Sequence, residues 1–108
     1  MIALFLALSL FAQERIYGPG AISYADLDAV VARRHWQGTE RFDLLLAPAD
    51  CNLLGRWVWV IVGGKVLDGL VVDCESPEHA GMMKERGLLF DGNDWDLVGE
   101  EAYFVVRQ

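Results

Sequence analysis

Two apolar runs joined by a pair of glycines, RWVWVIV and KVLDGLVVD, constrain the fold of this chain more than any other feature. The runs span residues 56–62 and 65–73, and Gly63 and Gly64 separate them. Two consecutive glycines suit a two-residue hairpin turn, because such a turn needs positive φ angles. Both faces of the first run are apolar, which is typical of a strand covered on both sides or closed into a barrel. Gly69 inside the second run indicates a bend or a close backbone approach, as at barrel corners.

Other short apolar runs predict further strands along the chain. They are RFDLLLA at residues 41–47, GLLF at 87–90 and AYFVVRQ at 102–108. Many short strands combined with one or two helices favour a mainly β fold, a small β-barrel with helical insertions. The length of 108 residues is typical of one domain, and 54% of the residues are hydrophobic, enough for one core.

Two segments have the pattern of helices. In GPGAISYADLDAVVARRHWQG, Ser23 is expected to cap a helix, and Asp26 completes a capping-box pattern three residues later. Apolar residues then recur on one helical face, and Gly38 is a suitable stop. A second, shorter helix is expected in SPEHAGMMKERG, starting after Pro77 and ending at Gly87.

The charge of the chain is unevenly distributed. Residues 1–67 carry as many acidic as basic side chains, whereas residues 68–108 carry ten acidic against three basic ones, so the net charge of −7 belongs to the C-terminal segment. Binding to phosphate groups requires clustered Lys and Arg, and a negative field repels them. Nucleic acid and anionic lipid surfaces are therefore poor partners.

The N-terminal segment MIALFLALSLFAQER begins with an uncharged apolar run at residues 2–12. A run of this length is too short to span a bilayer, which needs about 20 helical residues. It suits the hydrophobic region of a secretory signal peptide. We therefore expect residues 1–12 to be a signal peptide and residues 13–108 to form a single secreted, periplasmic or extracellular domain with no membrane anchor after processing. The alternative is a buried N-terminal strand or helix.

Cys51 and Cys74 are the only cysteines. An even pair suits an exported domain with one disulfide, and in a reducing compartment the two would be ordinary small buried residues. If they pair, the bridge closes a loop of roughly 24 residues and contributes about 3 kcal/mol in the chain-entropy account.

Acidic residues are the only abundant side chains of this sequence that could carry out a reaction. Asp73 stands at the end of an expected strand, and the acidic residues nearby are Glu75, Glu78, Asp91, Asp94 and Asp96. A carboxylate against apolar walls has its charged form disfavoured by desolvation, which makes it usable as a general acid or base near neutral pH. Paired carboxylates are what cleavage of a glycosidic bond commonly requires. The structural alternative is that Asp73 caps a turn and that the acidic loop is solvated surface.

No metal site or cofactor is expected. His35 and His79 are far apart in the chain, and no zinc-binding spacing is present. The segment DGNDWD at residues 91–96 has the composition of part of a calcium loop but lacks its ligand spacing and terminal glutamate. No phosphate loop, dinucleotide fingerprint or serine nucleophile motif appears.

The stretch LGRWVWVIVGGKVLDGLVVDC, a following M-x-x-R-G element and DWDLVGEEAYFVV together resemble the double-psi β-barrel family of rare lipoprotein A, which includes barwin and expansin-like domains. The resemblance covers roughly residues 17–107. Gly55, Gly64, Asp73 and the pair Asp96–Leu97 stand in the order typical of that family. It implies a six-stranded double-psi β-barrel with one N-terminal helix and a short second helix. Cys51 and Cys74 would then lie at facing strand ends, which is consistent with a disulfide.

The resemblance also implies candidate site residues. Asp73 matches the acid that is catalytic in the lytic transglycosylases of the family, which cleave peptidoglycan. The segment GTERFD is similar to a family element that carries a second functional carboxylate, which would be Glu40. Where the family has Ala-Ala-His, this chain has Ala47-Pro48-Ala49, and the family's Arg-Gly-Pro after the aspartate is replaced by CESPEH. The residues expected to contact substrate are Trp36, Trp95, Asp94 and Asp96.

Three hypotheses follow for the function. The first is an exported enzyme acting on a cell-wall glycan, peptidoglycan, in the manner of a lytic transglycosylase, with Asp73 as general acid or base. The second is a non-catalytic double-psi barrel that binds glycan or a protein in the same groove. The third is a structural or accessory protein of a bacterium or phage, in which Asp73 only stabilises the loop.

Overall fold

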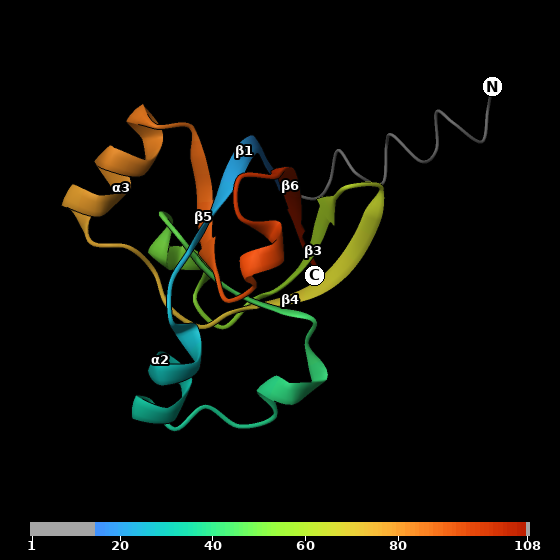
Figure 1. Ribbon diagram of the computed structural model, residues 1–108. Helices are drawn as coiled ribbons and strands as arrows, with labels where there is room; N and C mark the ends of the chain where they lie inside the picture. Colours follow the sequence, from blue (N-terminus) through green and yellow to red (C-terminus); the bar gives the residue numbers. More distant parts are fainter. Residues whose placement is uncertain (1–14, 108) are drawn as a thin grey trace.

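The computed structural model describes residues 15–107 of the protein, a small barrel with two α-helices on its outside (Figure 1). The expected signal peptide at residues 1–12 lies outside the described residues. The strands are β1 (Ile16–Tyr24), β2 (Leu44–Pro48), β3 (Trp57–Val62), β4 (Lys65–Val71), β5 (Leu88–Gly92) and β6 (Glu101–Val106). The helices are α2 (Leu27–Arg33) and α3 (Pro77–Glu85), with the short 3₁₀ turns η1 (Thr39–Arg41), η2 (Cys51–Leu53) and η3 (Trp95–Leu97). The predicted mainly β, six-stranded barrel with two helices is confirmed.

The strands close into a barrel in the order β1-β5-β2-β4-β3-β6. β1 pairs with β5 and β2 pairs with β4 in parallel, whereas the other neighbours are antiparallel. β1 and β2 follow each other in the chain but lie on either side of β5, and β4 and β5 lie on either side of β2. The chain therefore crosses over an intervening strand twice, once through α2 and once through α3.

The predicted Gly-Gly hairpin joins β3 to β4. Gly63 and Gly64 have φ angles of 56° and 75°, which L side chains rarely adopt, and Val62 pairs with Lys65 directly across the turn. Gly69 is a site of close approach, because a Cβ atom there would lie 2.6 Å from Leu46 Cδ1. Both glycine interpretations from the sequence are therefore confirmed.

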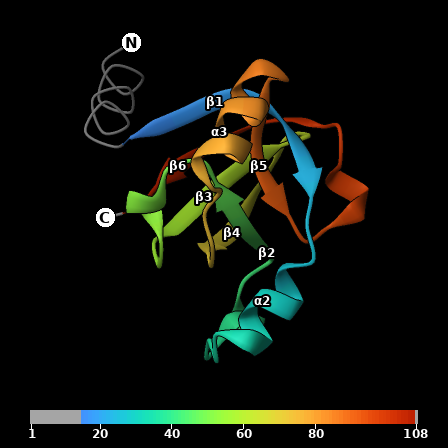
Figure 2. The same cartoon turned by 90° about the vertical axis from the view of Figure 1, so that its left-hand side faces the viewer.

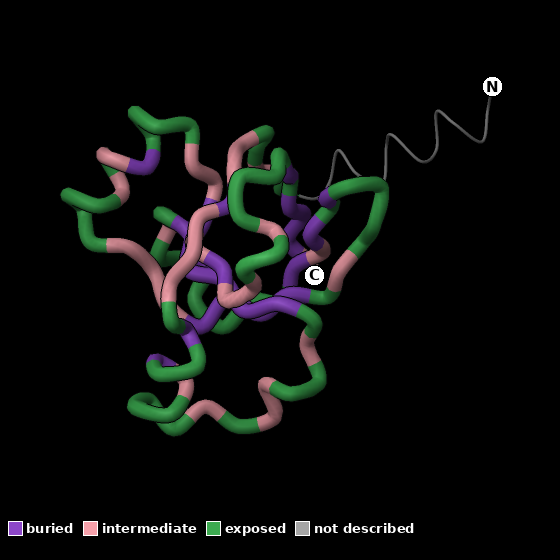
Figure 3. The backbone as a smooth tube through the Cα atoms, viewed as in Figure 1, coloured by how far each residue is buried: buried purple, intermediate pink, exposed green. Residues whose placement is uncertain are grey.

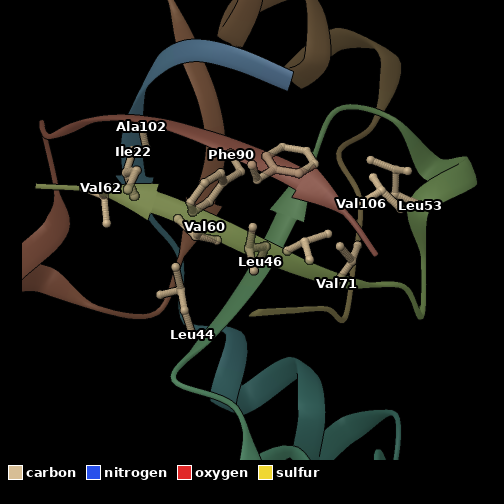
Figure 4. Packing of buried hydrophobic residues seen from close by; sticks show 12 residues of the cluster. Ile22, Leu44, Leu46, Leu53, Val60, Val62, Val71, Phe90, Ala102 and Val106 are labelled. Carbon is tan, nitrogen blue, oxygen red and sulfur yellow. The ribbon is translucent and has the colours of Figure 1, made fainter. Parts of the chain in front are cut away.

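The core fills the inside of the barrel (Figures 3 and 4). Alternate residues of β3 point inward, so that Val58, Val60 and Val62 are buried while Trp57 and Ile61 are exposed. The rings of Phe90 and Phe104 pack edge to face in the interior, with their centroids 6.0 Å apart. A second apolar cluster packs α2 on the outer side of β2 and β4, with Leu27 and Val30 against Leu45 and Val72.

The first helix is shorter than expected, and its predicted cap is wrong. α2 begins at Leu27 with Asp26 as N-cap, whose carboxylate accepts a hydrogen bond from Ala29 N at 3.2 Å. Ser23 belongs to β1 instead, because its pairing with Asp91 of β5 continues the strand through Tyr24. Gly38 does not end α2, which stops at Arg33; Gly38 precedes η1. The second helix begins and ends close to the predicted residues, with Ser76 as its N-cap.

Candidate functional site

Neighbouring parallel strands deliver two carboxylates to one edge of the barrel. β2 and β4 run side by side in the same direction, with Leu46 opposite Val71. The chain continues along β2 after β4 ends, since Val72 N donates to Leu46 O and Glu75 N donates to Pro48 O, both at 3.0 Å. The segment that carries Asp73 and Glu75 is therefore held along β2 by backbone hydrogen bonds, although it lies beyond the end of β4.

A disulfide fixes the same edge. Cys51 and Cys74 are bonded, with their Cα atoms 5.0 Å apart. Cys51 lies shortly after β2, and Cys74 lies shortly after β4. Parallel neighbouring strands end at the same edge of a sheet, so the following segments can be cross-linked. The bridge thus constrains the segment that carries Asp73 and Glu75, and the predicted pairing is confirmed.

Beside this edge is a cavity of about 470 Å³, here called the acidic groove, between α3, α2 and the ends of β1 and β5. Figure 2 shows α3 lying outside the barrel beside β5. Its charged and polar lining residues are Ser23, Asp73, Glu75, His79, Arg86 and Asp91. Its apolar walls include Leu27, Val30, Met82, Met83 and Leu88. Carboxylates in an apolar cleft are the arrangement in which perturbed acid–base groups are found.

Asp73 lies on one side of the acidic groove, where an arginine and a backbone N–H contact its side chain. Its Oδ1 atom lies 3.2 Å from Arg34 Nη2, and the same oxygen accepts a hydrogen bond from Cys74 N at 2.9 Å. The Asp73 side chain is 23% exposed and remains accessible from the groove. These two contacts fix the position of the Asp73 side chain at the edge of the groove.

Glu75 has the opposite environment. Its side chain is only 12% exposed, and desolvation, a hydrogen bond with Asp91 and the negative charges of Asp91 and Asp73 raise its pKa to about 8. Glu75 therefore carries a proton at neutral pH. Asp91 in turn accepts a short hydrogen bond from Ser23 Oγ, and His79 Nδ1 lies 3.5 Å from Glu75 Oε2.

No family model, curated protein sequence or solved structure matches the chain. The barrel and the side chains of the acidic groove are thus the grounds on which function can be inferred.

Two of the candidate residues lie away from the acidic groove. Glu40 is an exposed residue of η1 and is not among the residues that line the groove. Trp36 follows α2, packs in part against the cluster beneath that helix, and is likewise not part of the lining. The structure therefore does not bring Glu40 together with Asp73 as a second carboxylate. The acidic residues that line the groove with Asp73 are Glu75 and Asp91.

The other candidate residues are in η3 and its N-cap, next to Tyr24, which lines the groove. Trp95 is 68% exposed and stacks on Tyr24, with ring centroids 4.0 Å apart and an interplanar angle of 12°. Tyr24 lines the acidic groove, so the two rings form an aromatic surface that leads out of it. Asp94 caps η3 by accepting from Asp96 N, which gives both residues a local structural role.

Sequence reasoning noted Glu75 and Asp91 as acidic neighbours but did not select them for the site. Glu75 lies two residues beyond Asp73 in an extended segment, a spacing that places alternate side chains on the same side. Asp91 reaches the groove through the parallel pairing of β1 with β5, and Ser23 was assigned to a helix cap. The parallel pairing could not be read from the order of the strands.

Two further observations concern residues 15–107 alone. Across this range, no group of three or more His, Cys, Asp or Glu side chains is arranged to hold a metal ion. Neither α2, α3 nor any other helix in the described range is long and apolar enough to cross a membrane.

Proposed function

We propose that this protein is a double-psi β-barrel that binds and cleaves a cell-wall glycan, peptidoglycan, in the acidic groove. The observation that carries the proposal is the position of Asp73 and Glu75 together in an apolar-walled groove of about 470 Å³. One of these carboxyl groups is paired with an arginine, and the other is surrounded by acidic and apolar groups. Environments that differ in this way separate an acid from a base.

The connectivity of the barrel supports the family assignment. β1 and β2 follow each other in the chain and flank β5, and β4 and β5 flank β2. The barrel therefore has two connections that cross over an intervening strand, a topology compatible with the proposed family. Asp73 follows β4 at the position where the resemblance puts the functional acid of the double-psi family.

The two carboxyl groups have distinct roles in the proposed reaction. Glu75, protonated at neutral pH, donates its proton to the glycosidic oxygen as the bond to the sugar carbon breaks. Asp73, paired with Arg34, is the carboxylate that stabilises the positive charge developing on the sugar or takes up a proton from the attacking hydroxyl. The sequence alone gave Asp73 the role of general acid or base; in this proposal Glu75, whose pKa is raised, is the acid and Asp73, paired with Arg34, is the second carboxyl group.

Export to the cell wall is part of the proposal. The Cys51–Cys74 disulfide supports it, because such bonds persist in oxidising compartments. Intact mass spectrometry of the protein recovered from cells tests this point. We expect a mature chain that starts near Gln13 and gains two protons on reduction; an unprocessed chain with two free thiols would contradict export.

Incubation with purified peptidoglycan tests cleavage. The amounts of soluble muropeptides released by the wild type, Asp73→Asn, Glu75→Gln and Glu78→Gln are compared by chromatography and mass spectrometry. Loss of a general acid or base typically costs about 10²–10⁴-fold in rate, and we expect losses of this order for the first two variants. Glu78 is exposed in the first turn of α3, three residues after Glu75, and serves as the matched control. Equal release by all four proteins would refute the assignment.

A non-catalytic glycan-binding barrel is the second candidate, and the Tyr24–Trp95 pair favours it. Stacked aromatic rings that are exposed at a groove suit the apolar face of a sugar ring. Under this alternative the wild type releases no muropeptides but sediments with peptidoglycan, and Trp95→Ala weakens sedimentation. Absence of both release and sedimentation would leave the third hypothesis, a structural or accessory protein.

A further inference from the structure

Three adjacent strands bring Ser23, Asp91 and Glu75 together at one edge of the barrel. Ser23 of β1 is in register with Asp91 of β5, and Asp91 is in register with Ala47 of β2. Glu75 is bound through its backbone to Pro48, the next residue of β2. Because β5 lies between β1 and β2, Asp91 lies between Ser23 and Glu75 in the lining of the acidic groove.

The hydrogen bonds along this row of three side chains have a defined donor and acceptor. The Ser23 hydroxyl is within hydrogen-bonding distance of Phe90 O, at 3.1 Å, and of Asp91 Oδ1. Asp91 is the stronger acceptor of the two, because it is a carboxylate. Because the Ser23 hydroxyl donates to Asp91, Asp91 is the acceptor in this row, and a proton shared between the two carboxyl groups resides on Glu75, whose pKa is raised. Two carboxyl groups in contact cannot both be ionised cheaply, and one of them keeps a proton.

We propose that Glu75 and Asp91 form a carboxyl–carboxylate pair that holds one proton, and that Ser23 is the positioning residue that assigns this proton to Glu75. The pair is a property of the groove itself, and its use as the proton source for bond cleavage rests on the proposed function. The Ser23 side chain does not touch the reacting bond in this arrangement; it acts through Asp91.

Other charged groups face Glu75 from each element around it. Those that line the same groove are Asp73 on the segment after β4, His79 on α3, Arg86 at the C-cap of α3, and Asp91 on β5. Arg34, which follows α2, forms an ion pair with Asp73. His79 is 63% exposed and lies 3.5 Å from Glu75, so solvent screens its effect on the pair.

Carboxyl ¹³C NMR of the intact protein, titrated from pH 3 to pH 10, tests the proposal without a substrate. We expect a step near pH 8 that appears mainly in the Glu75 carboxyl resonance. In Asp91→Asn the Glu75 step should move by more than one pH unit toward acid, because the neighbouring negative charge is gone. A wild-type Glu75 that titrates near pH 4, or an Asp91→Asn variant with an unchanged Glu75 step, would overturn the pair.

Two variants of Ser23 test the assignment of the proton. In Ser23→Ala the high-pH step should be divided between the Glu75 and Asp91 resonances, because Asp91 loses the donor that makes it the acceptor of the pair. Ser23→Thr keeps a hydroxyl and should restore the wild-type pattern, whereas a purely structural role would leave the division of the step unchanged in Ser23→Ala. Folding of each variant is read from the same spectra.

The two proposals can fail separately. A confirmed pair in a protein that releases no muropeptides sustains the shared proton and rejects catalysis. Muropeptide release by a protein whose Glu75 titrates near pH 4 sustains catalysis and rejects the pair.

Discussion

Arg34 Nη2 lies 3.2 Å from Asp73 Oδ1 and joins the end of α2 to the segment that follows β4. The two residues are far apart in sequence and are brought together by the packing of α2 on the outer side of β2 and β4. The Arg34 side chain is 46% exposed, so this ion pair contributes little to stability, on the order of 1 kcal/mol or less. Its effect is to hold the Asp73 side chain in one position at the edge of the groove.

Arg34→Gln is expected to reduce muropeptide release by on the order of tenfold to a hundredfold, because a displaced catalytic group loses its orientation. The free energy of unfolding, measured by urea denaturation, should change by no more than about 1 kcal/mol. Arg33→Gln, a change of the same kind at the neighbouring exposed position, is the control and should affect neither quantity. Equal loss of activity in both variants would argue against a specific role for the Arg34–Asp73 pair.

Removal of the Cys51–Cys74 bridge by the double substitution to serine is expected to cost about 3 kcal/mol, because the bridge closes a loop between residues separated by 23 positions. For a domain of this size each kcal/mol corresponds to a Tm shift of roughly 4–8 °C, so Tm should fall by roughly 12–24 °C. Differential scanning calorimetry of the wild type with and without reductant provides the same comparison without a mutation. A Tm that is insensitive to reductant would contradict the expected stabilisation.

The parts of the fold that local pattern determines could be predicted from the sequence. The Gly63–Gly64 turn and the alternation in β3 depend on neighbouring residues, and both were recognised. β1 was missed because its sequence, IYGPGAISY, contains glycines and a proline that are unusual within a strand. Its strand conformation results from pairing with β5 and β6, which are distant in the chain.

The candidate site was predictable only in part for the same reason. Asp73 could be selected because it ends an apolar strand and matches a family position. Glu75 and Asp91 become partners through the order β1-β5-β2-β4, in which consecutive strands are not neighbours. No local pattern encodes that order, so Glu40 was chosen as the second acid while Asp91 stayed in the acidic loop.

Gly69→Ala is expected to destabilise the protein by roughly 1–3 kcal/mol through overpacking. The added Cβ would lie 2.6 Å from Leu46 Cδ1 and 3.0 Å from Val58 Cγ2, inside the barrel, where both side chains are completely buried. The matched control is Gly81→Ala in α3, where nothing lies within 4 Å of the added atom. That change should stabilise the helix by up to about 1 kcal/mol. Urea denaturation of both variants checks the opposite signs; a neutral Gly69→Ala would mean that the barrel can expand there.

The stability of the protein should fall as pH rises from about 5 to about 9, because the pKa of Glu75 is raised from 4.5 to about 8 on folding. Between these two values the folded state binds more protons than the unfolded state, so each increment of pH favours unfolding. Glu75→Gln removes this titration, and its Tm should decline less than that of the wild type over the same range and exceed it at pH 9. Glu78→Gln, at an exposed position of α3, should follow the wild-type curve. Thermal unfolding at pH 5, 6.5, 8 and 9 provides the comparison, and parallel curves for Glu75→Gln and the wild type would show that Glu75 ionises at the same pH in both states.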